Sequence, residues 1–194
     1  GGKASAQDTV VDYTNWTTLT KGMEYREITA PIKSPIGDSK ISILRMERSI
    51  FDFNIFSATK FDSIPRDLHS WADTFDLNVV FNAGMYNLSK PLKSRAYLKA
   101  GDHINNGTVI ENFNLMMAMG PTVKKRDNVE ILDLTCENFN EMNSEFRSYA
   151  QGLRMIDCNG SPMYWKKKIQ SCSMLIAAEG EDGKFYLIFC RSPY

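Results

Sequence analysis

The strongest constraint on the fold is a β-hairpin pattern late in the chain. Two strand-like apolar runs, Ser173–Ala178 and Lys184–Cys190, are separated by the short turn Glu181-Asp182-Gly183. Glycine at the end of such a turn tolerates the positive φ angle that tight hairpin connections need. The two runs therefore predict an antiparallel pair of strands, and with it a fold built at least partly from antiparallel sheet.

Other segments show the period of two that is typical of strands, and two show the period of a helix. One predicted helix opens at Ser63 with Pro65 in its first turn, and the other runs from Glu137 to about Tyr149. The polar stretch between Asn87 and Thr108 is typical of a long surface excursion. The further predicted strands are Met23–Thr29, Lys40–Met46, Phe51–Ser57, Leu77–Phe81, Leu115–Met119 and Val129–Leu134. Many strands with few helices favour an α+β fold, with a mostly antiparallel mixed sheet and two or more packed helices.

Length and charge narrow the possible classes of protein. A chain of 194 residues is close to the usual size of one domain, so we expect a disordered or tag-like leader at 1–15 and a single domain at 16–194. The 23 basic residues balance 23 acidic ones, which leaves no positive field to attract nucleic acid. We therefore expect no nucleic-acid partner. No apolar run approaches the roughly 18 residues of a transmembrane helix, and we expect no transmembrane segment.

The four cysteines do not match a metal-binding pattern. Cys136, Cys158, Cys172 and Cys190 include no C-x-x-C pair and have no nearby histidine to complete a zinc site. We expect reduced, structural cysteines, with one or two disulfides as the alternative. Acidic residues show no calcium-loop spacing either, so the sequence predicts neither a metal site nor a cofactor.

The segment with the clearest chemical potential is Asn82-Ala83-Gly84-Met85-Tyr86, directly after the predicted strand Leu77–Phe81. An apolar strand that ends in Asn-small-Gly can hold an amide and free backbone N–H groups at the floor of a cleft. The alternative interpretation is that Asn82 only caps a turn. The motifs of serine hydrolases, P-loop enzymes, dinucleotide-binding proteins and zinc proteases are all missing from the sequence.

This segment resembles the signature of the phosphodiester glycosidase family, in which a buried strand runs into Asn-Gly/Ala-Gly-Met/Phe-Phe/Tyr. The order of further motifs resembles the bacterial branch of that family over nearly the whole chain after residue 15. These motifs are Trp16, Lys21–Tyr25 and Ile43–Met46 before the loop, and Gln151–Ile156, the Trp165 region, Ser173–Ile176 and Phe189–Tyr194 after it. Members of the family continue past this last motif to a strand that ends in Asp/Glu-Gly-Gly. We therefore expect an incomplete domain, a C-terminal segment or second chain that completes it, or a loss of activity.

The resemblance implies a hydrolase that cleaves the glycosidic bond of sugar-1-phosphodiesters outside the cytoplasm, with a phosphorylated sugar or glycan as its substrate and no cofactor. A phosphomonoester is already a good leaving group. The reaction then needs cations and N–H donors for the phosphodiester, a carboxylate to activate water or stabilise an oxocarbenium-like centre, and hydrogen bonds to the sugar.

Several residues are candidates for these tasks. Arg154 and Arg191 suit the phosphate because a guanidinium can donate two parallel hydrogen bonds, although each could instead form a surface ion pair. No acid is an obvious catalyst; Asp157 and Glu179 are the candidates, and both lie where solvated charges are common. The substrate-binding candidates are Asn82, Gly84, Met85, Tyr86, His103, Arg154, Ser173, Arg191 and Tyr194.

Two other classes of function stay open. The first is a non-catalytic glycan- or surface-binding module on the same scaffold. The second is a structural domain whose open sheet edge is completed by a partner chain. A fold alone does not decide among these, because function depends on the chemistry of the site.

Overall fold

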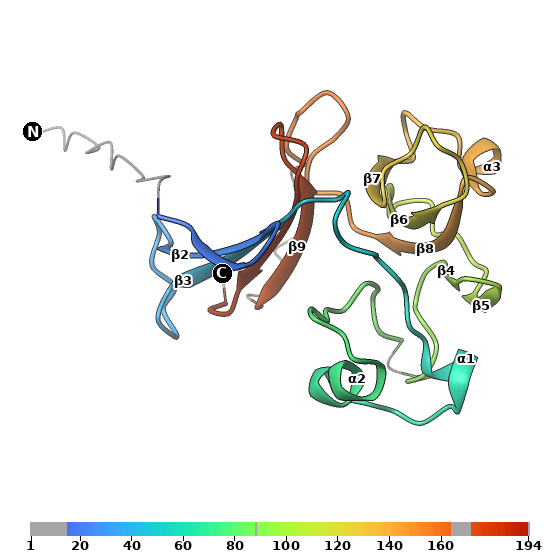
Figure 1. Cartoon of the computed structure of the whole chain (residues 1–194), viewed down its shortest axis with the longest axis horizontal. Helices are drawn as coiled ribbons and strands as arrows, with labels where there is room; N and C mark the ends of the chain where they lie inside the picture. The colour runs from blue at the N-terminus through green and yellow to red at the C-terminus, as the bar shows by residue number, and fades with distance from the viewer. Residues whose placement is uncertain (1–14, 88, 164–171, 194) are drawn as a thin grey trace, which may run out of the picture.

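A computed structural model describes residues 15–87, 89–163 and 172–193 of the chain. Within these residues the protein has two five-stranded sheets and three short helices (Figure 1). This confirms the predicted α+β class, and every strand pair among the described residues is antiparallel. Nearly all of the predicted leader, at residues 1–14, lies outside the described residues, and no described helix is long and apolar enough to cross a membrane.

The first sheet joins an early part of the chain to a late one. Its strand order is β1-β2-β3-β10-β9, so β10 lies between β3 and β9. The predicted hairpin is confirmed: Gly183 has a φ of 77°, and Phe185 pairs with Glu179 at the start of the ladder. The strands are β1 (Thr17–Thr20), β2 (Met23–Thr29), β3 (Lys40–Met46), β9 (Met174–Glu179) and β10 (Phe185–Cys190).

The second sheet comes from the middle of the chain. Its strand order is β5-β4-β8-β6-β7. Two of its strands, β4 and β5, lie in the stretch 87–108 that the sequence predicts as a surface excursion. The prediction is wrong for part of this stretch, because Ala96 and Ala100 are fully buried. The strands are β4 (Leu98–Ala100), β5 (His103–Asn106), β6 (Leu115–Pro121), β7 (Val129–Asp133) and β8 (Phe146–Gly152).

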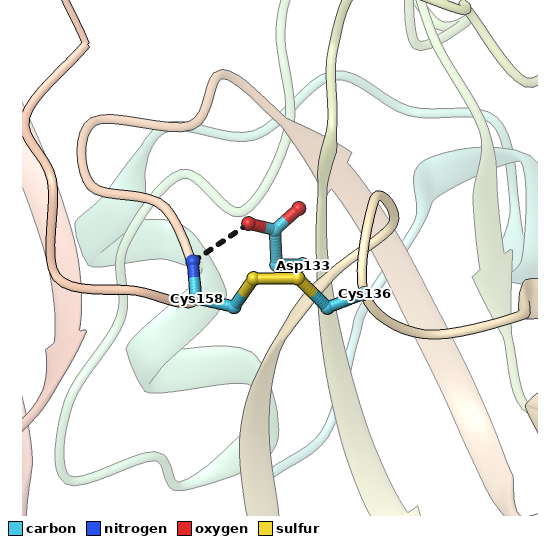
Figure 2. Close-up of side chains that lie close together, drawn as sticks. All are labelled: Asp133, Cys136 and Cys158. Atoms are coloured by element: carbon cyan, nitrogen blue, oxygen red, sulfur yellow. Dashed lines mark hydrogen bonds between the residues drawn. A yellow bond between two sulfur atoms is a disulfide. The ribbon is translucent and has the colours of Figure 1, made fainter.

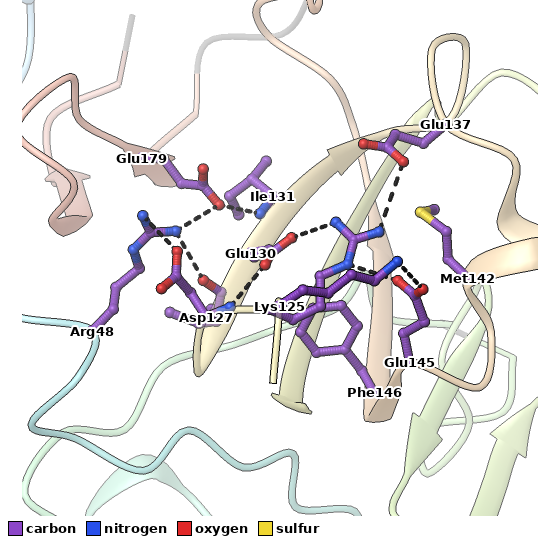
Figure 3. A network of polar contacts seen from close by, with 12 residues as sticks. Arg48, Lys125, Asp127, Glu130, Ile131, Glu137, Met142, Glu145, Phe146 and Glu179 are labelled. Atoms are coloured by element: carbon purple, nitrogen blue, oxygen red, sulfur yellow. Dashed lines mark hydrogen bonds and ion pairs between the residues drawn. The ribbon is translucent and has the colours of Figure 1, made fainter. Parts of the chain in front are cut away.

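Both sheets contribute to one hydrophobic core. Met46 and Phe185 of the first sheet belong to the same buried cluster as Met117 and Val129 of the second. Arg48 links the sheets through polar contacts as well, because its Nε donates to the carbonyl of Gly183 at 2.8 Å and its Nη1 to that of Val129 at 3.3 Å. Figure 3 shows this arginine next to Asp127 and Glu179, with which it forms ion pairs of 2.9 and 3.5 Å.

The predicted helix from Glu137 to Tyr149 is wrong. The structure has only a short helix, α3 (Phe139–Met142), and the chain then turns into β8. The helical spacing of apolar residues identified the buried ones, because Phe139, Met142, Phe146 and Tyr149 all pack in a second core cluster. The Tyr149 hydroxyl stabilises the turn by accepting from the Phe146 amide at 3.0 Å and donating to the Met142 carbonyl.

Two predicted strands, Phe51–Ser57 and Leu77–Phe81, are also wrong, since neither segment belongs to a described sheet. The first helix begins later than predicted. Asp67 rather than Ser63 is the N-cap of α2 (Leu68–Phe75), and its carboxylate accepts from the Ser70 amide at 2.7 Å. A one-turn helix, α1 (Ala58–Phe61), precedes it, and Figure 1 shows both helices on one side of the two sheets.

Candidate functional site

The candidate site is a cavity of about 890 Å³ beside the shared core. Its wall includes residues 50–58, the start of α2, the loop 76–86 and residues 91–94. The two segments that were wrongly predicted as strands therefore form much of this wall. Apolar cavities of this size with a few polar groups are the usual form of small-molecule sites.

The Asn82-Ala83-Gly84-Met85-Tyr86 loop lines the cavity. The four substrate-binding candidates within this loop therefore all belong to the cavity wall. The exposed Asn82 side chain has no hydrogen-bond partner in the described part of the chain, so its amide is available to a ligand. Tyr86 forms an isolated antiparallel bridge with Ser94, and the Arg95 amide donates to the Met85 carbonyl at 2.9 Å. These contacts hold the loop against the segment that leads into β4 of the second sheet.

Gly84 is favoured here by limited space and not by backbone angle. Its φ lies outside the left-handed region, whereas a Cβ atom at this position would lie 3.3 Å from the Ser94 hydroxyl and 3.5 Å from a methyl of Leu98. The glycine therefore allows the close approach of the loop to the strand below it.

The segment 51–57 contributes polar groups that sequence reasoning missed. Its burial alternates as in a strand, with Phe53 and Ile55 buried in the core. Asp52, Asn54 and Phe56 alternate with these residues and are more exposed, and both sets belong to the cavity wall. Among the described residues, no hydrogen bond or ion pair engages the Asp52 carboxylate. An acid, an amide and an aromatic residue of this segment are therefore among the residues that line the cavity.

Aromatic residues of α1 and α2 pack behind this face. Phe56 lies 4.8 Å from Phe75 and 6.1 Å from Trp71, measured between ring centroids. The guanidinium of Arg66 lies 5.1 Å from the Trp71 ring centre and forms an ion pair with Asp62. Flat aromatic surfaces of this kind offer an apolar face to a ligand.

Two other acids of the cavity wall have different surroundings. The backbone N–H of Ser70 lowers the pKa of Asp67, whose carboxylate is occupied as the cap of α2. Asp76 follows α2 with a left-handed backbone at φ 52°. No described hydrogen bond or ion pair engages the Asp76 carboxylate or the Asp52 carboxylate, and Asp52 is the one on a segment anchored in the core by Phe53 and Ile55.

His103 lies next to this cavity, in a second one of about 380 Å³. Its Nε2 is 2.8 Å from the hydroxyl of Thr59, and that hydroxyl accepts from the Asn105 side chain at 2.8 Å. Asn105 contributes to the walls of both cavities. The structure thus places His103 in a different cavity from the Asn82 loop, although the two cavities share wall residues.

The structure places Arg154 and Asp157 elsewhere, in a loop closed by a disulfide. Cys136 and Cys158 are bonded, so the expectation of reduced cysteines is wrong for this pair (Figure 2). Arg154 donates to both oxygens of Asp133 at 2.6 Å, and Asp157 accepts from the Asn159 and Ser161 amides of its own turn. Both side chains therefore stabilise the loop.

The group formed by Asp133, Cys136 and Cys158 has the residue types of a metal site. Its donor atoms are already used, however, because the two sulfurs are bonded to each other and Asp133 accepts from Arg154, Thr135 and the Cys158 amide. Burial alone raises the pKa of Asp133, yet these hydrogen bonds lower it to about 2. The arrangement fits an ionised carboxylate that organises the loop.

The remaining candidates lie around the first sheet, outside the cavity wall. Arg191 forms an ion pair with Asp38, and Ser173 is exposed just before β9. Glu179 accepts from the Ile131 amide at 2.6 Å; burial raises the pKa of its carboxyl although that hydrogen bond and Arg48 oppose the effect. Tyr194 and the Trp165 region lie outside the described residues.

The residues that sequence reasoning missed had weak signals. Only the alternation of residues 51–57 could have placed Asp52 and Asn54 opposite the buried Phe53. Comparison with known proteins adds no assignment, since no family model and no curated protein matches this chain.

Proposed function

We propose that this protein is a hydrolase that cleaves the glycosidic bond of sugar-1-phosphodiesters, of the phosphodiester glycosidase type. The observation that carries the proposal is the placement of the free Asn82 amide and the free Asp52 carboxylate in the wall of one aromatic cavity. The resemblance of the Asn82–Tyr86 loop to the family signature supplies the bond type. The cavity supplies a volume suited to a sugar.

The role of each group follows from the chemistry of the bond. Asn82 donates hydrogen bonds to sugar hydroxyls, and the ring of Phe56 covers an apolar face of the sugar. Asp52 activates the attacking water or stabilises the positive charge that develops at the anomeric carbon. The leaving phosphomonoester needs little protonation, so the proposal assigns no general acid to the site.

The disulfide supports the extracytoplasmic location that goes with this proposal, because stable disulfides belong mostly to oxidising compartments. A second candidate function is a glycan-binding module without catalysis. Its supporting observation is the same aromatic and amide-lined cavity, which can hold a sugar whether or not Asp52 acts on it.

Release of free sugar from a panel of sugar-1-phosphodiesters, including a UDP-N-acetylhexosamine, tests the proposal. We expect Asp52→Asn to lower kcat at least about a hundredfold and Asn82→Ala to raise KM or lower kcat/KM. Asn140→Ala is the matched control, since Asn140 is an exposed asparagine of α3 outside the cavity wall. Sugar binding without turnover, lost in Asn82→Ala but kept in Asp52→Asn, would favour the binding module. Neither binding nor turnover by folded protein would refute both.

A further inference from the structure

The loop 153–163 exposes several large apolar side chains to solvent. Between 36% and 61% of each is exposed, and they are Leu153, Met155, Ile156 and Met163. Single exposed apolar residues are normal on a protein surface, whereas a concentration of them in one short loop marks a contact surface. No residue of this loop lines the candidate site, and Figure 1 shows the loop, in orange, on the opposite side of the view from α2.

The loop is held in one conformation by its own contacts. The Met163 amide donates to the Met155 carbonyl at 2.9 Å, and the chain between them forms a short antiparallel hairpin. The disulfide at Cys158 and the ion pair of Arg154 with Asp133 attach this hairpin to the protein near the end of β7. A surface that is already ordered loses little conformational entropy when it binds. The apolar side chains are therefore presented by a fixed structure.

The exposed apolar residues lie on two faces of the hairpin. Neighbouring residues of an extended segment point to opposite faces, and the neighbours Met155 and Ile156 are 41% and 61% exposed. A partner protein with a flat surface would cover only one of these faces. The fluid boundary of a membrane can surround both, so this arrangement favours a lipid surface over a protein surface.

The sequence next to the hairpin has the composition of a membrane-interface segment. Met163 is followed by Tyr164-Trp165-Lys166-Lys167-Lys168, the only run of three lysines in the chain. Tyrosine and tryptophan are enriched at the level of the lipid headgroups, and lysines next to a membrane attract anionic lipids. Within the hairpin both charged side chains are occupied, since Arg154 pairs with Asp133 and Asp157 accepts from two amides of its own turn. The composition therefore favours an anionic membrane over a neutral one.

We propose that the hairpin 153–163 is a docking surface for an anionic lipid membrane, with Leu153, Met155, Ile156 and Met163 as the side chains that enter the lipid. Such binding is peripheral and reversible, because a few apolar side chains bury far less area than a membrane-spanning helix. The inference does not depend on the proposed function, since the hairpin contributes nothing to the cavity wall.

Co-sedimentation with lipid vesicles tests this inference. We expect the protein to bind vesicles of mixed phosphatidylserine and phosphatidylcholine, and the Met155→Ser/Ile156→Ser variant to bind them at least about tenfold more weakly, because it loses apolar area in the lipid contact. Ile32→Ser/Ile36→Ser is the matched control. These two side chains are 75% and 68% exposed outside the hairpin, so this variant should match the wild type within about twofold.

The composition of the vesicles and of the buffer separates the apolar from the electrostatic contribution. Vesicles of phosphatidylcholine alone, or a high salt concentration, should weaken binding at least about fivefold, because the anionic charge is then missing or screened. Absence of vesicle binding by the wild type would overturn the inference and leave a protein as the partner of the hairpin. Equal binding by the hairpin variant, or equal binding to both kinds of vesicle, would overturn it as well. Thermal unfolding of each variant checks that these exposed substitutions leave the fold intact.

Discussion

Asp133→Asn should destabilise the protein by about 2 kcal/mol at pH 7. The substitution keeps the shape of the side chain but removes the charge that faces Arg154. Because asparagine has a single oxygen, only one of the exposed Thr135 and Cys158 amides, which donate to different oxygens of Asp133, keeps its acceptor. Only 10% of the Asp133 side chain and 11% of the Arg154 side chain are exposed, so water replaces little of the lost interaction.

The magnitude follows from the pKa of the carboxyl, which lies at about 2 against an ordinary 3.8. One pKa unit corresponds to about 1.4 kcal/mol, so the folded protein favours the ionised form by about 2 kcal/mol. With a typical urea dependence of about 2 kcal/mol per M, the unfolding midpoint should fall by about 1 M. The disulfide must stay intact during the measurement.

The pH dependence gives the sharper test. A carboxyl whose pKa is lower in the folded protein stabilises it above the unfolded pKa, and this contribution disappears as the pH falls through the folded value. The stability gap between wild type and Asp133→Asn should therefore be full above about pH 5 and nearly closed at about pH 2. Glu27→Gln is the control, since the Glu27–Lys40 pair is 39% and 48% exposed and its loss should leave the stability almost unchanged. A gap independent of pH would refute the reasoning.

Three further predictions concern stability. Replacing Cys136 and Cys158 together by serine opens a loop with a sequence separation of 22 and should lower the free energy of unfolding by about 3 kcal/mol. Urea unfolding with and without a dithiol reductant measures this, and the reductant should destabilise only the wild type. Tyr149→Phe leaves two buried backbone groups without their partner and should cost about 1–3 kcal/mol in thermal unfolding, with unchanged far-ultraviolet circular dichroism. Arg48→Met removes hydrogen bonds that link the two sheets and should cost about 1–3 kcal/mol, whereas Lys40→Met should change the unfolding midpoint little.

The sequence predicted those strands that pair with a strand close to them in the sequence. The bounds of β2 and β3 match the predicted segments, and the turn at Gly183 identified the β9–β10 hairpin. The segments 51–57 and 77–81 have equally strand-like composition, but neither pairs with a strand of either sheet, and both line the cavity. The local composition of a segment indicates whether it is buried and extended. Whether it pairs with another strand depends on tertiary contacts, which local composition does not predict.

The candidate site, too, could be predicted from the sequence only in part. The Asn82 loop was found because its residues are adjacent in sequence and form a recognisable motif. Asp52, Trp71 and Lys93 reach the same cavity from separate segments, so no single window of sequence could group them. Arg154 was chosen for its chemistry, and only the structure places Asp133 next to it.

The strand order of the first sheet has a consequence for how the protein folds. β3 and β10 are neighbours, and Met46 pairs with Phe185 with most of the chain between them. During synthesis the hairpin of β2 and β3 emerges early and exposes the edge of β3 until β10 leaves the ribosome. Such long-range pairing slows folding, since the entropy of closing a large loop is lost before the contact forms. The nascent chain should therefore depend on protection of that edge by chaperones, and refolding should be slower than the small size of the protein suggests.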